Sequence, residues 1–314
     1  MLRIRPVVAA ALLAVALVGC VGQETEDLVT TSAPPVATTP STVPGPAIDT
    51  TTTTFESSEP DEAATLVERP EWGDAFATEG VVGTIAVHKI GSDRIDVFDP
   101  NRAEEPRTPA STFKILNSLV ILETSVLPDV ETEVLWDGQD RGIPVWNQDH
   151  SLRSGIQVSA VWLYQQMARE VGSERMSDWV SKAEYGNADI SGGIDQFWLS
   201  GALRISVFEQ IDFLSRLVQG ELPFSGQTVA AVREILVRES GDGWAWSHKT
   251  GTSLSSIPDL GWLVGITENA NEEWVFALSI DLERVDDVAT QLNPQARQRI
   301  ARVILESEGA LPGS

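Results

Sequence analysis

A serine and a lysine with the spacing of a catalytic pair stand at the start of an apolar run. Ser111 carries a hydroxyl, Lys114 carries an amine three residues later, and the residues that follow are almost all apolar. On a helix, side chains at i and i+3 share a face, so the amine can reach the hydroxyl. Apolar surroundings favour a neutral lysine, which can act as a nucleophile or a base. The pair also fits a helix with a serine cap and a lysine that extends to solvent.

Four further short motifs follow along the chain. Ser159–Val161 is expected to open a helix, Tyr185–Asn187 lies in a turn-rich stretch, Trp198 lies in a mixed segment, and Lys249–Gly251 is expected to end a strand. Each motif taken alone also has an ordinary structural explanation. In the same order, these are the start of a helix, a turn, an aromatic residue of the core and the solvated end of a strand. Acyl transfer needs a nucleophile, a base, a proton relay, oxyanion donors and a substrate anchor. Together the motifs supply a candidate for each role.

These motifs occur in the order found in class D, or oxacillinase-type, serine β-lactamases. The chain resembles that family over about residues 70–312, including the intervening segments 154–159, 165–172 and 190–195. The resemblance implies the α+β fold of serine β-lactamases and penicillin-binding-protein transpeptidases. It also implies hydrolysis of the β-lactam amide, and so resistance to penicillin-type antibiotics.

The resemblance further implies how the residues around the nucleophile act. Ser111 would be acylated, and Lys114 would combine with CO2 to give an N-carboxylated lysine, the general base. Val161 would keep the surroundings of this carbamate apolar, and Trp198 would donate its indole N–H to it. Ser159 would pass a proton to the β-lactam nitrogen as the ring opens. No other cofactor is implied.

A second set of residues is implied in binding the β-lactam. It comprises Val161, Thr250, Gly251, Thr252 and Arg297, and Lys249, which the resemblance places among the catalytic residues, would line the site beside them. Lys249 would add positive potential, and the backbone N–H groups of Ser111 and Thr252 would form the oxyanion hole. Arg297 would pair with the substrate carboxylate through its planar guanidinium group. Alternatively, Arg297 is a solvent-exposed charge on the closing helix, like Arg299.

Two neighbouring features are expected to take no part in the chemistry. Tyr185–Asn187 is expected to shape a wall of the site. His248 precedes Lys249, and neighbours on a strand point to opposite faces, so His248 is expected to face away from the site.

Composition excludes several other kinds of partner. The 314 residues carry a formal net charge of −24, which argues against nucleic acid and anionic membranes as partners. The single cysteine excludes an intrachain disulfide and a thiolate metal site, and the three histidines lie far apart in the sequence. We therefore predict no metal site.

The first 64 residues are expected to export and tether the protein. Residues 1–19 have Arg3 and Arg5 before an apolar run, as a secretory signal does, and Cys20 completes a sequence that resembles a bacterial lipobox. Residues 20–64 form a Thr- and Pro-rich acidic stretch that is expected to be disordered. The predicted location is the outer face of a cell envelope, with a lipid on Cys20 as the membrane contact. An ordinary signal peptide also fits.

Residues 65–314 are expected to form one α+β domain. Strands are expected at 81–88, 95–98, 243–248, 261–267 and 274–280, the last two as an antiparallel hairpin. Helices are expected after Ser111, in the amphipathic stretch 157–170 with its start near Ser159, at 174–182, 207–219 and 226–239, and from Pro294 onward. This order predicts an antiparallel sheet built from both ends of the domain, flanked by helices, with a helical subdomain inserted between them.

Two alternatives to a hydrolase remain open at this point. A penicillin-binding or β-lactam-sensing domain would be acylated on Ser111 and would not turn over. Such sensors place several membrane helices before the domain, whereas this chain has one signal segment and a flexible tether. A binding lipoprotein with a dead site would lack part of the constellation, and every part is present.

Overall fold

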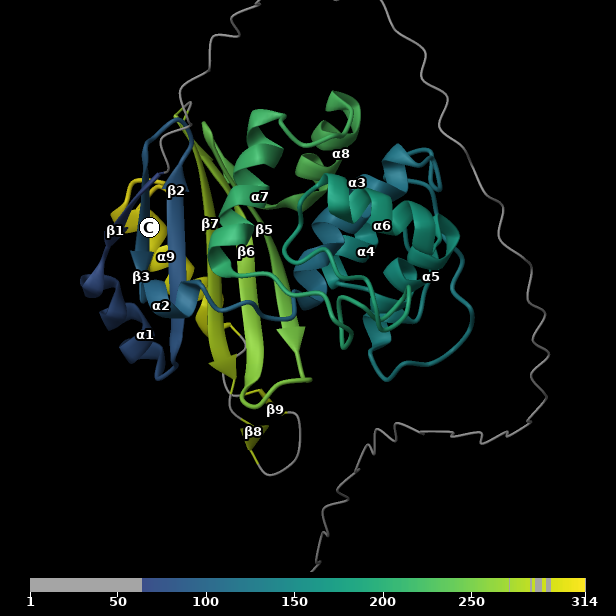
Figure 1. Ribbon diagram of the computed structural model, residues 1–314, viewed down its shortest axis with the longest axis horizontal. Coiled ribbons are helices and arrows are strands. Elements are labelled where there is room, and N and C mark those ends of the chain that lie inside the picture. Colours follow the sequence, from purple (N-terminus) through teal and green to yellow (C-terminus); the bar gives the residue numbers. More distant parts are fainter. Residues whose placement is uncertain (1–63, 271, 283, 286–289, 292–294, 314) are drawn as a thin grey trace, which may run out of the picture. The chain divides into compact units, whose positions relative to one another are not determined.

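A computed structural model describes residues 64–313, except 271, 283, 286–289 and 292–294 (Figure 1). The predicted signal segment, Cys20, almost all of the predicted tether and Pro294 lie outside the described residues. Within the described part, no helix is both long and apolar enough to cross a bilayer.

One mixed sheet of seven strands organises the described residues (Figure 1). Its spatial order is β1-β3-β2-β7-β6-β5-β4. The strands are β1 Thr65–Glu68, β2 Gly83–Lys89, β3 Arg94–Phe98, β4 Val237–Gly241, β5 Trp244–Ser253, β6 Asp259–Asn269 and β7 Glu272–Leu282. A separate pair, β8 Arg284–Val285 and β9 Thr290–Gln291, is antiparallel. The sheet is built from both ends of the domain, as predicted, and β6 and β7 form the predicted hairpin.

The sheet is antiparallel as predicted except at one edge, where it carries a strand, β1, that the sequence did not predict. β1 pairs in parallel with β3, with Thr65 opposite Arg94, while every other pair in the main sheet is antiparallel. After β1, the chain passes through α1 (Gly73–Glu79) and β2 before it returns as β3 beside β1. Parallel neighbours require such a crossover.

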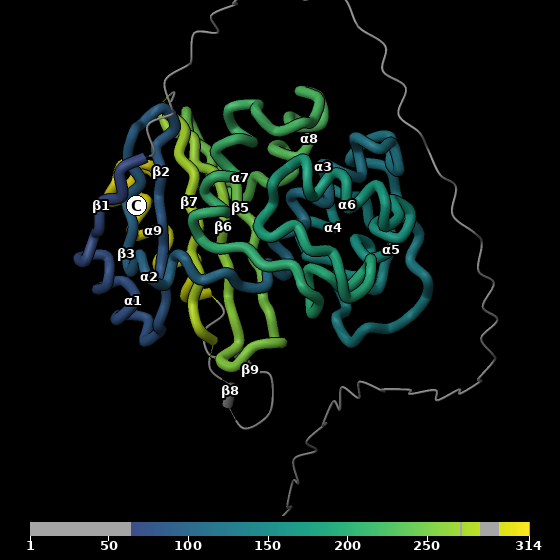
Figure 2. Tube along the Cα trace, viewed as in Figure 1, coloured from purple at the N-terminus to yellow at the C-terminus, as the bar shows by residue number. Residues whose placement is uncertain are grey.

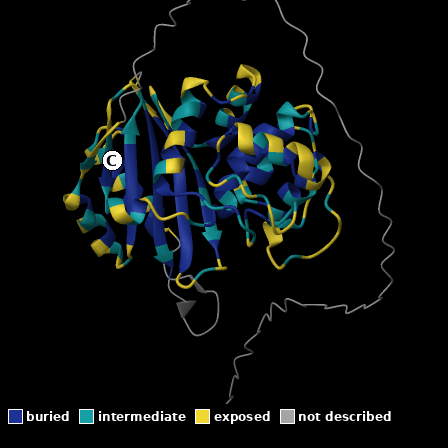
Figure 3. Ribbon diagram, viewed as in Figure 1, coloured by how far each residue is buried: buried dark blue, intermediate teal, exposed yellow. Residues whose placement is uncertain are grey.

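The central strands are apolar because both faces of the sheet are covered. Neighbouring residues Leu263 and Val264 on β6 belong to different hydrophobic cores, as expected when side chains alternate between faces. One core packs against α1 and α9 (Ala296–Ser307), and the other packs against α7 (Val207–Gln219) and the helical subdomain. In Figure 3 the central strands are accordingly buried along almost their whole length.

The predicted helical subdomain is present between β3 and β4, at the right of Figures 1 and 2. Its α-helices are α3 Lys114–Glu123, α4 Leu152–Val158, α5 Val161–Val171, α6 Ser173–Lys182 and α8 Gly226–Leu236. The shorter elements of the domain are η1 Pro70–Trp72, α2 Pro100–Ala103, η2 Ala110–Phe113 and η3 Pro144–Trp146. α7 has the predicted bounds, and the closing helix α9 is also present.

Most observed boundaries differ from the predicted ones by a few residues, and three of these differences concern the segments around the site. The helix expected to start near Ser159 is present as α5, which begins at Val161, but residues 157 and 158 belong to a separate helix, α4, that was not expected. Ser159 follows α4 in a left-handed conformation with φ 56°. The helix expected to reach residue 239 ends at Leu236, where the β-branched Val237 begins β4. Lys249–Gly251 lies inside a strand and does not end it, since β5 continues to Ser253 as it pairs with β6.

Candidate active site

The nucleophile candidate lies at the junction of η2 and α3, where a short tight helix becomes an α-helix. Ala110, just before Ser111, has a positive φ of 50°, an uncommon conformation for a residue with a side chain. Lys114 begins α3, and its Nζ donates a hydrogen bond of 2.7 Å to Ser111 Oγ. Lys114 is fully buried, and this burial lowers its pKa from 10.5 to about 7. A substantial fraction of the amine is therefore neutral near neutral pH.

A buried tyrosine, which sequence reasoning did not single out, lies beside Lys114. The ring centroid of Tyr164, on α5, lies 5.3 Å from Lys114 Nζ. Its hydroxyl lies 3.0 Å from Ser118 Oγ, and Ser118 Oγ donates to the backbone carbonyl of Lys114 at 2.8 Å. Val161 lies one turn before Tyr164 on the same helical face. That i, i+3 spacing is the sequence signal that could have identified Tyr164.

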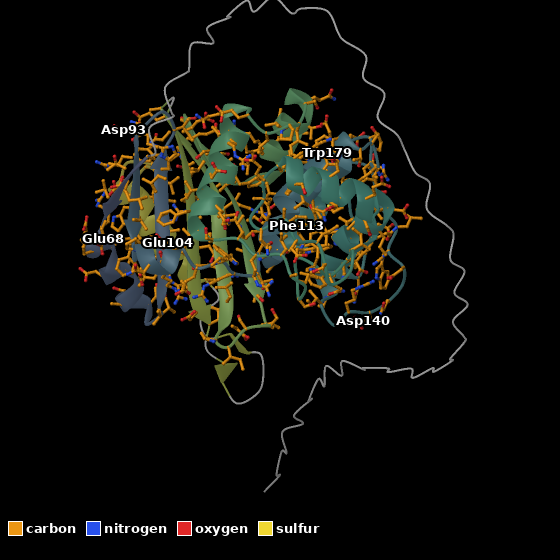
Figure 4. All side chains as sticks on the ribbon, viewed as in Figure 1. Glu68, Asp93, Glu104, Phe113, Asp140 and Trp179 are labelled. Atoms are coloured by element: carbon orange, nitrogen blue, oxygen red, sulfur yellow. The ribbon has the colours of Figure 1, made fainter. Side chains whose placement is uncertain are left out.

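An aromatic cluster packs behind the nucleophile, near the Phe113 label in Figure 4. Phe113 stacks on Trp198 at a centroid distance of 5.3 Å and meets the edges of Tyr185 and Phe197. The indole Nε1 of Trp198 is buried, and no described atom accepts a hydrogen bond from it. A buried donor without an acceptor costs free energy, so this N–H has unused capacity for an anion.

The break between α4 and α5 brings a second hydroxyl to a second lysine. Lys249 Nζ, on β5, donates to Ser159 Oγ at 3.1 Å and to the carbonyl of Thr250 at 2.8 Å. Lys249 is almost fully buried, and its pKa is held well below the ordinary value, chiefly by burial and then by the positive charges of Lys114, Arg238 and Arg297. Ser159 and Lys249 thus form a second serine–lysine pair.

Strand β5 runs closely against η2 and positions the predicted binding residues. A Cβ atom at Gly251 would lie 3.0 Å from the carbonyl oxygen of Pro109, so a larger residue there would push the strand away. Arg297 Nη1, on α9, donates to the carbonyl of Gly251 at 2.7 Å and to Thr252 Oγ1 at 3.3 Å. Burial lowers the pKa of Arg297 to about 10, and its Nε has no acceptor among the described atoms.

The sequence and the fold both match known proteins. The profile of the penicillin binding protein transpeptidase domain matches residues 80–306. The crystal structure of the class D β-lactamase YbXI from Nostoc superposes with a TM-score of 0.72 at 38% identity, covering 77% of this chain and 100% of that chain. The chain belongs to the class D β-lactamases.

Further members of the class D family match over most of their length. β-Lactamase OXA-10 of Pseudomonas aeruginosa is 39% identical over 254 residues, which are 80% of this chain and 93% of that protein. β-Lactamase OXA-48 of Klebsiella pneumoniae is 35% identical over 245 residues, 78% of this chain and 90% of that protein. The family and the fold implied by the motifs are therefore confirmed.

Two motif residues of this class D chain have structural partners. Tyr185 is buried and its hydroxyl accepts from Gln210 at 3.2 Å, while Asn187 Nδ2 donates to the carbonyl of Ala202 at 3.0 Å. The ring of His248 lies 4.8 Å from that of Trp246 at an interplanar angle of 58°, and Trp246 belongs to the core on the α9 side of the sheet. Burial and nearby cations lower the pKa of His248 to about 3, so it is neutral at physiological pH.

No three His, Cys, Asp or Glu side chains among the described residues are grouped so that they could hold a metal ion.

The buried Lys114 amine should make the stability of the class D fold depend on pH. Between pH 7 and 10.5 the unfolded chain binds a proton at Lys114 that the folded chain lacks. Stability should therefore rise with pH through this window and fall as the pH drops towards 7, with about 1.4 kcal/mol per pH unit as the limit for one group. Lys114→Met should flatten this rise in denaturant titrations at several pH values in CO2-free buffer.

The matched control is Lys182→Met, which removes an exposed lysine that pairs with Asp178. It should leave the slope unchanged. Equal slopes for wild type and Lys114→Met would show that the amine is not held neutral by the fold.

Proposed function

We propose that the chain hydrolyses β-lactams through an acyl-enzyme on Ser111, and so protects a bacterium from penicillin-type antibiotics. The observation that carries the proposal is the 2.7 Å contact between Ser111 Oγ and the buried amine of Lys114. Family membership supports it, since the relatives OXA-10 and OXA-48 are named β-lactamases. Ser111 is assigned as the residue that is acylated because its motif resembles the nucleophile motif of the family.

The two serine–lysine pairs suit the two halves of ring opening. Ser111 Oγ forms the new C–O bond to the lactam carbonyl carbon as its proton passes to the base at Lys114. The C–N bond breaks, and the leaving nitrogen takes a proton from Ser159, which Lys249 contacts at 3.1 Å. Ser159 recovers a proton through Lys249, and the base at Lys114 gives up the one that it took from Ser111. Water then attacks the ester carbonyl carbon and gives a proton to the base at Lys114, the C–O bond to Ser111 breaks, Ser111 takes up that proton, and the ring-opened acid leaves.

The surroundings of Lys114 fit a carbamate made from CO2. A neutral amine is the form that adds CO2, and burial makes Lys114 neutral in part near pH 7. The unpartnered indole N–H of Trp198 could serve as a donor to an anion. When bound, the carbamate supplies an anionic general base next to Ser111. Val161 and the ring of Tyr164 contribute apolar surface on the α5 side.

Strand β5 and α9 suit the binding of the rest of the substrate. The guanidinium of Arg297, which lies on Gly251 and Thr252, offers a cation for the carboxylate of a β-lactam. Thr250 and Thr252 are partly exposed along β5 and can line the bound ring. The backbone N–H groups of Ser111 and Thr252 are the proposed oxyanion donors.

Intact-mass spectrometry during reaction with a chromogenic cephalosporin tests the proposal. Purified residues 63–314 should turn over many equivalents, with only a transient acyl adduct on Ser111. Ser111→Ala should reduce turnover by at least about a thousandfold, because it removes the nucleophile. A single stoichiometric burst with a persistent adduct would instead identify a β-lactam-sensing or penicillin-binding domain.

Trp198→Phe tests the carbamate by removing one N–H while keeping an aromatic ring against Phe113. Deacylation should slow by about tenfold to a hundredfold, so that acyl-enzyme accumulates, and added bicarbonate should partly restore turnover. Trp72→Phe is the matched control, because Trp72 Nε1 is also buried without a described partner but lies in the other core. Wild-type activity that is indifferent to bicarbonate would contradict the carbamate.

We propose in addition that the enzyme is exported and held at a cell envelope by a lipid on Cys20, the chain's single cysteine. The lipobox-like sequence and the acidic stretch that follows support this proposal. Full-length protein made in a bacterium fed radiolabelled palmitate should carry label and sediment with membranes. Cys20→Ser should lose both properties, and a labelled Cys20→Ser protein would refute the assignment.

A further inference from the structure

Arg238, the second residue of β4, links two parts of the site although it belongs to none of the family motifs. Its Nη2 donates to the carbonyl of Ile156 on α4 at 3.0 Å, and its Nε donates to the carbonyl of His248 on β5 at 3.2 Å. It forms no ion pair with any described carboxylate, and burial lowers its pKa below the usual value. A partly buried arginine whose hydrogen bonds go to backbone carbonyls acts as a brace.

The two carbonyls that Arg238 holds flank the Ser159–Lys249 pair. Ile156 lies one turn before Ser159, at the end of α4, and His248 directly precedes Lys249 on β5. Ser159 and Lys249 are 90 residues apart, and the 3.1 Å contact between them depends on how α4 sits against β5. Arg238 bonds both elements through one rigid guanidinium, so it fixes that relation.

Arg238 also contributes charge to the pair. The pKa of Lys249 is lowered by the positive charges of Lys114 on α3, Arg238 on β4 and Arg297 on α9, while its neighbour His248 is neutral at physiological pH. Because no described carboxylate contributes to this group, each cation disfavours a proton on Lys249. Removing the charge of Arg238 should therefore raise the pH at which Lys249 loses its proton.

We propose that Arg238 is a positioning residue, which holds Ser159 against Lys249 so that the pair delivers a proton to the leaving nitrogen. The inference rests on the proposed function, since it assigns a role within ring opening. It places the role of Arg238 in acylation, before the ester is hydrolysed.

Three substitutions separate the two contributions of Arg238. Arg238→Lys keeps the charge and loses the two-pronged contact, Arg238→Gln keeps an amide donor and loses the charge, and Arg238→Met loses both. The matched control is Arg233→Gln, because Arg233 lies on α8 and pairs with Glu268 and Glu273, away from the site.

Acylation by benzylpenicillin, followed by rapid-quench mass spectrometry, should slow by about tenfold to a hundredfold in Arg238→Met and Arg238→Lys, as expected when a reacting group is misplaced. Arg238→Gln should retain more activity, and the alkaline limb of its pH–rate profile should move upward. In Arg238→Lys the alkaline limb of the pH–rate profile should stay at the wild-type pH, because the charge is retained. Arg233→Gln should match wild type in rate and profile.

An aryl ester with the same acyl group as the penicillin separates a positioning defect from a general loss of structure, which would slow acylation by both substrates equally. Its phenolate leaves without a proton, so the defect of Arg238→Met should shrink several-fold relative to the defect with penicillin. An equal loss with both substrates, or a folded Arg238→Met that acylates at the wild-type rate, would overturn the inference. If wild type forms no adduct with penicillin at all, the proposed function itself fails.

Discussion

The desolvation of one amine is the constraint on which the rest of the site depends. Lys114 begins α3 with its side chain inside the protein, where a charged ammonium is costly. The fold tolerates this cost because α3, α5 and the aromatic cluster around Phe113 surround the amine with apolar surface, and because Ser111 accepts its hydrogen bond. The packing of the helical subdomain therefore also sets the protonation of the group beside the nucleophile.

The Ser159–Lys249 pair is brought together in a different way from the Ser111–Lys114 pair. Ser159 lies within the inserted helical block and Lys249 lies on β5, 90 residues later, so local sequence cannot bring them together. Their contact requires the left-handed break at Ser159, the pairing of β5 with β6 and the bridge from Arg238. The first pair is thus set mainly by helix geometry, and the second by tertiary structure.

This difference explains how much of the molecule could be predicted from the sequence. The Ser111–Lys114 contact, the bounds of α7 and the β6–β7 hairpin follow from spacing and apolar periodicity. Strand β1 was missed, because a short and largely exposed segment gains its pairing only from β3. The helix start near Ser159 was predicted, but the short helix α4 before it was not. Arg238 looks like an ordinary strand residue because its partners are distant carbonyls.

Basic side chains gather around β5 in this acidic chain, on β5 itself, on the neighbouring β4 and on α9. Lys249, Arg238 and Arg297 have no described carboxylate as a partner, within a chain whose formal net charge is −24. Mobile ions weaken the repulsion from the acidic exterior beyond a Debye length of about 8 Å at physiological ionic strength, whereas buried charges are screened much less. An anionic ligand is then attracted only at short range, once it has lost much of its hydration. The enzyme would therefore select anions by contact and would not steer them from a distance.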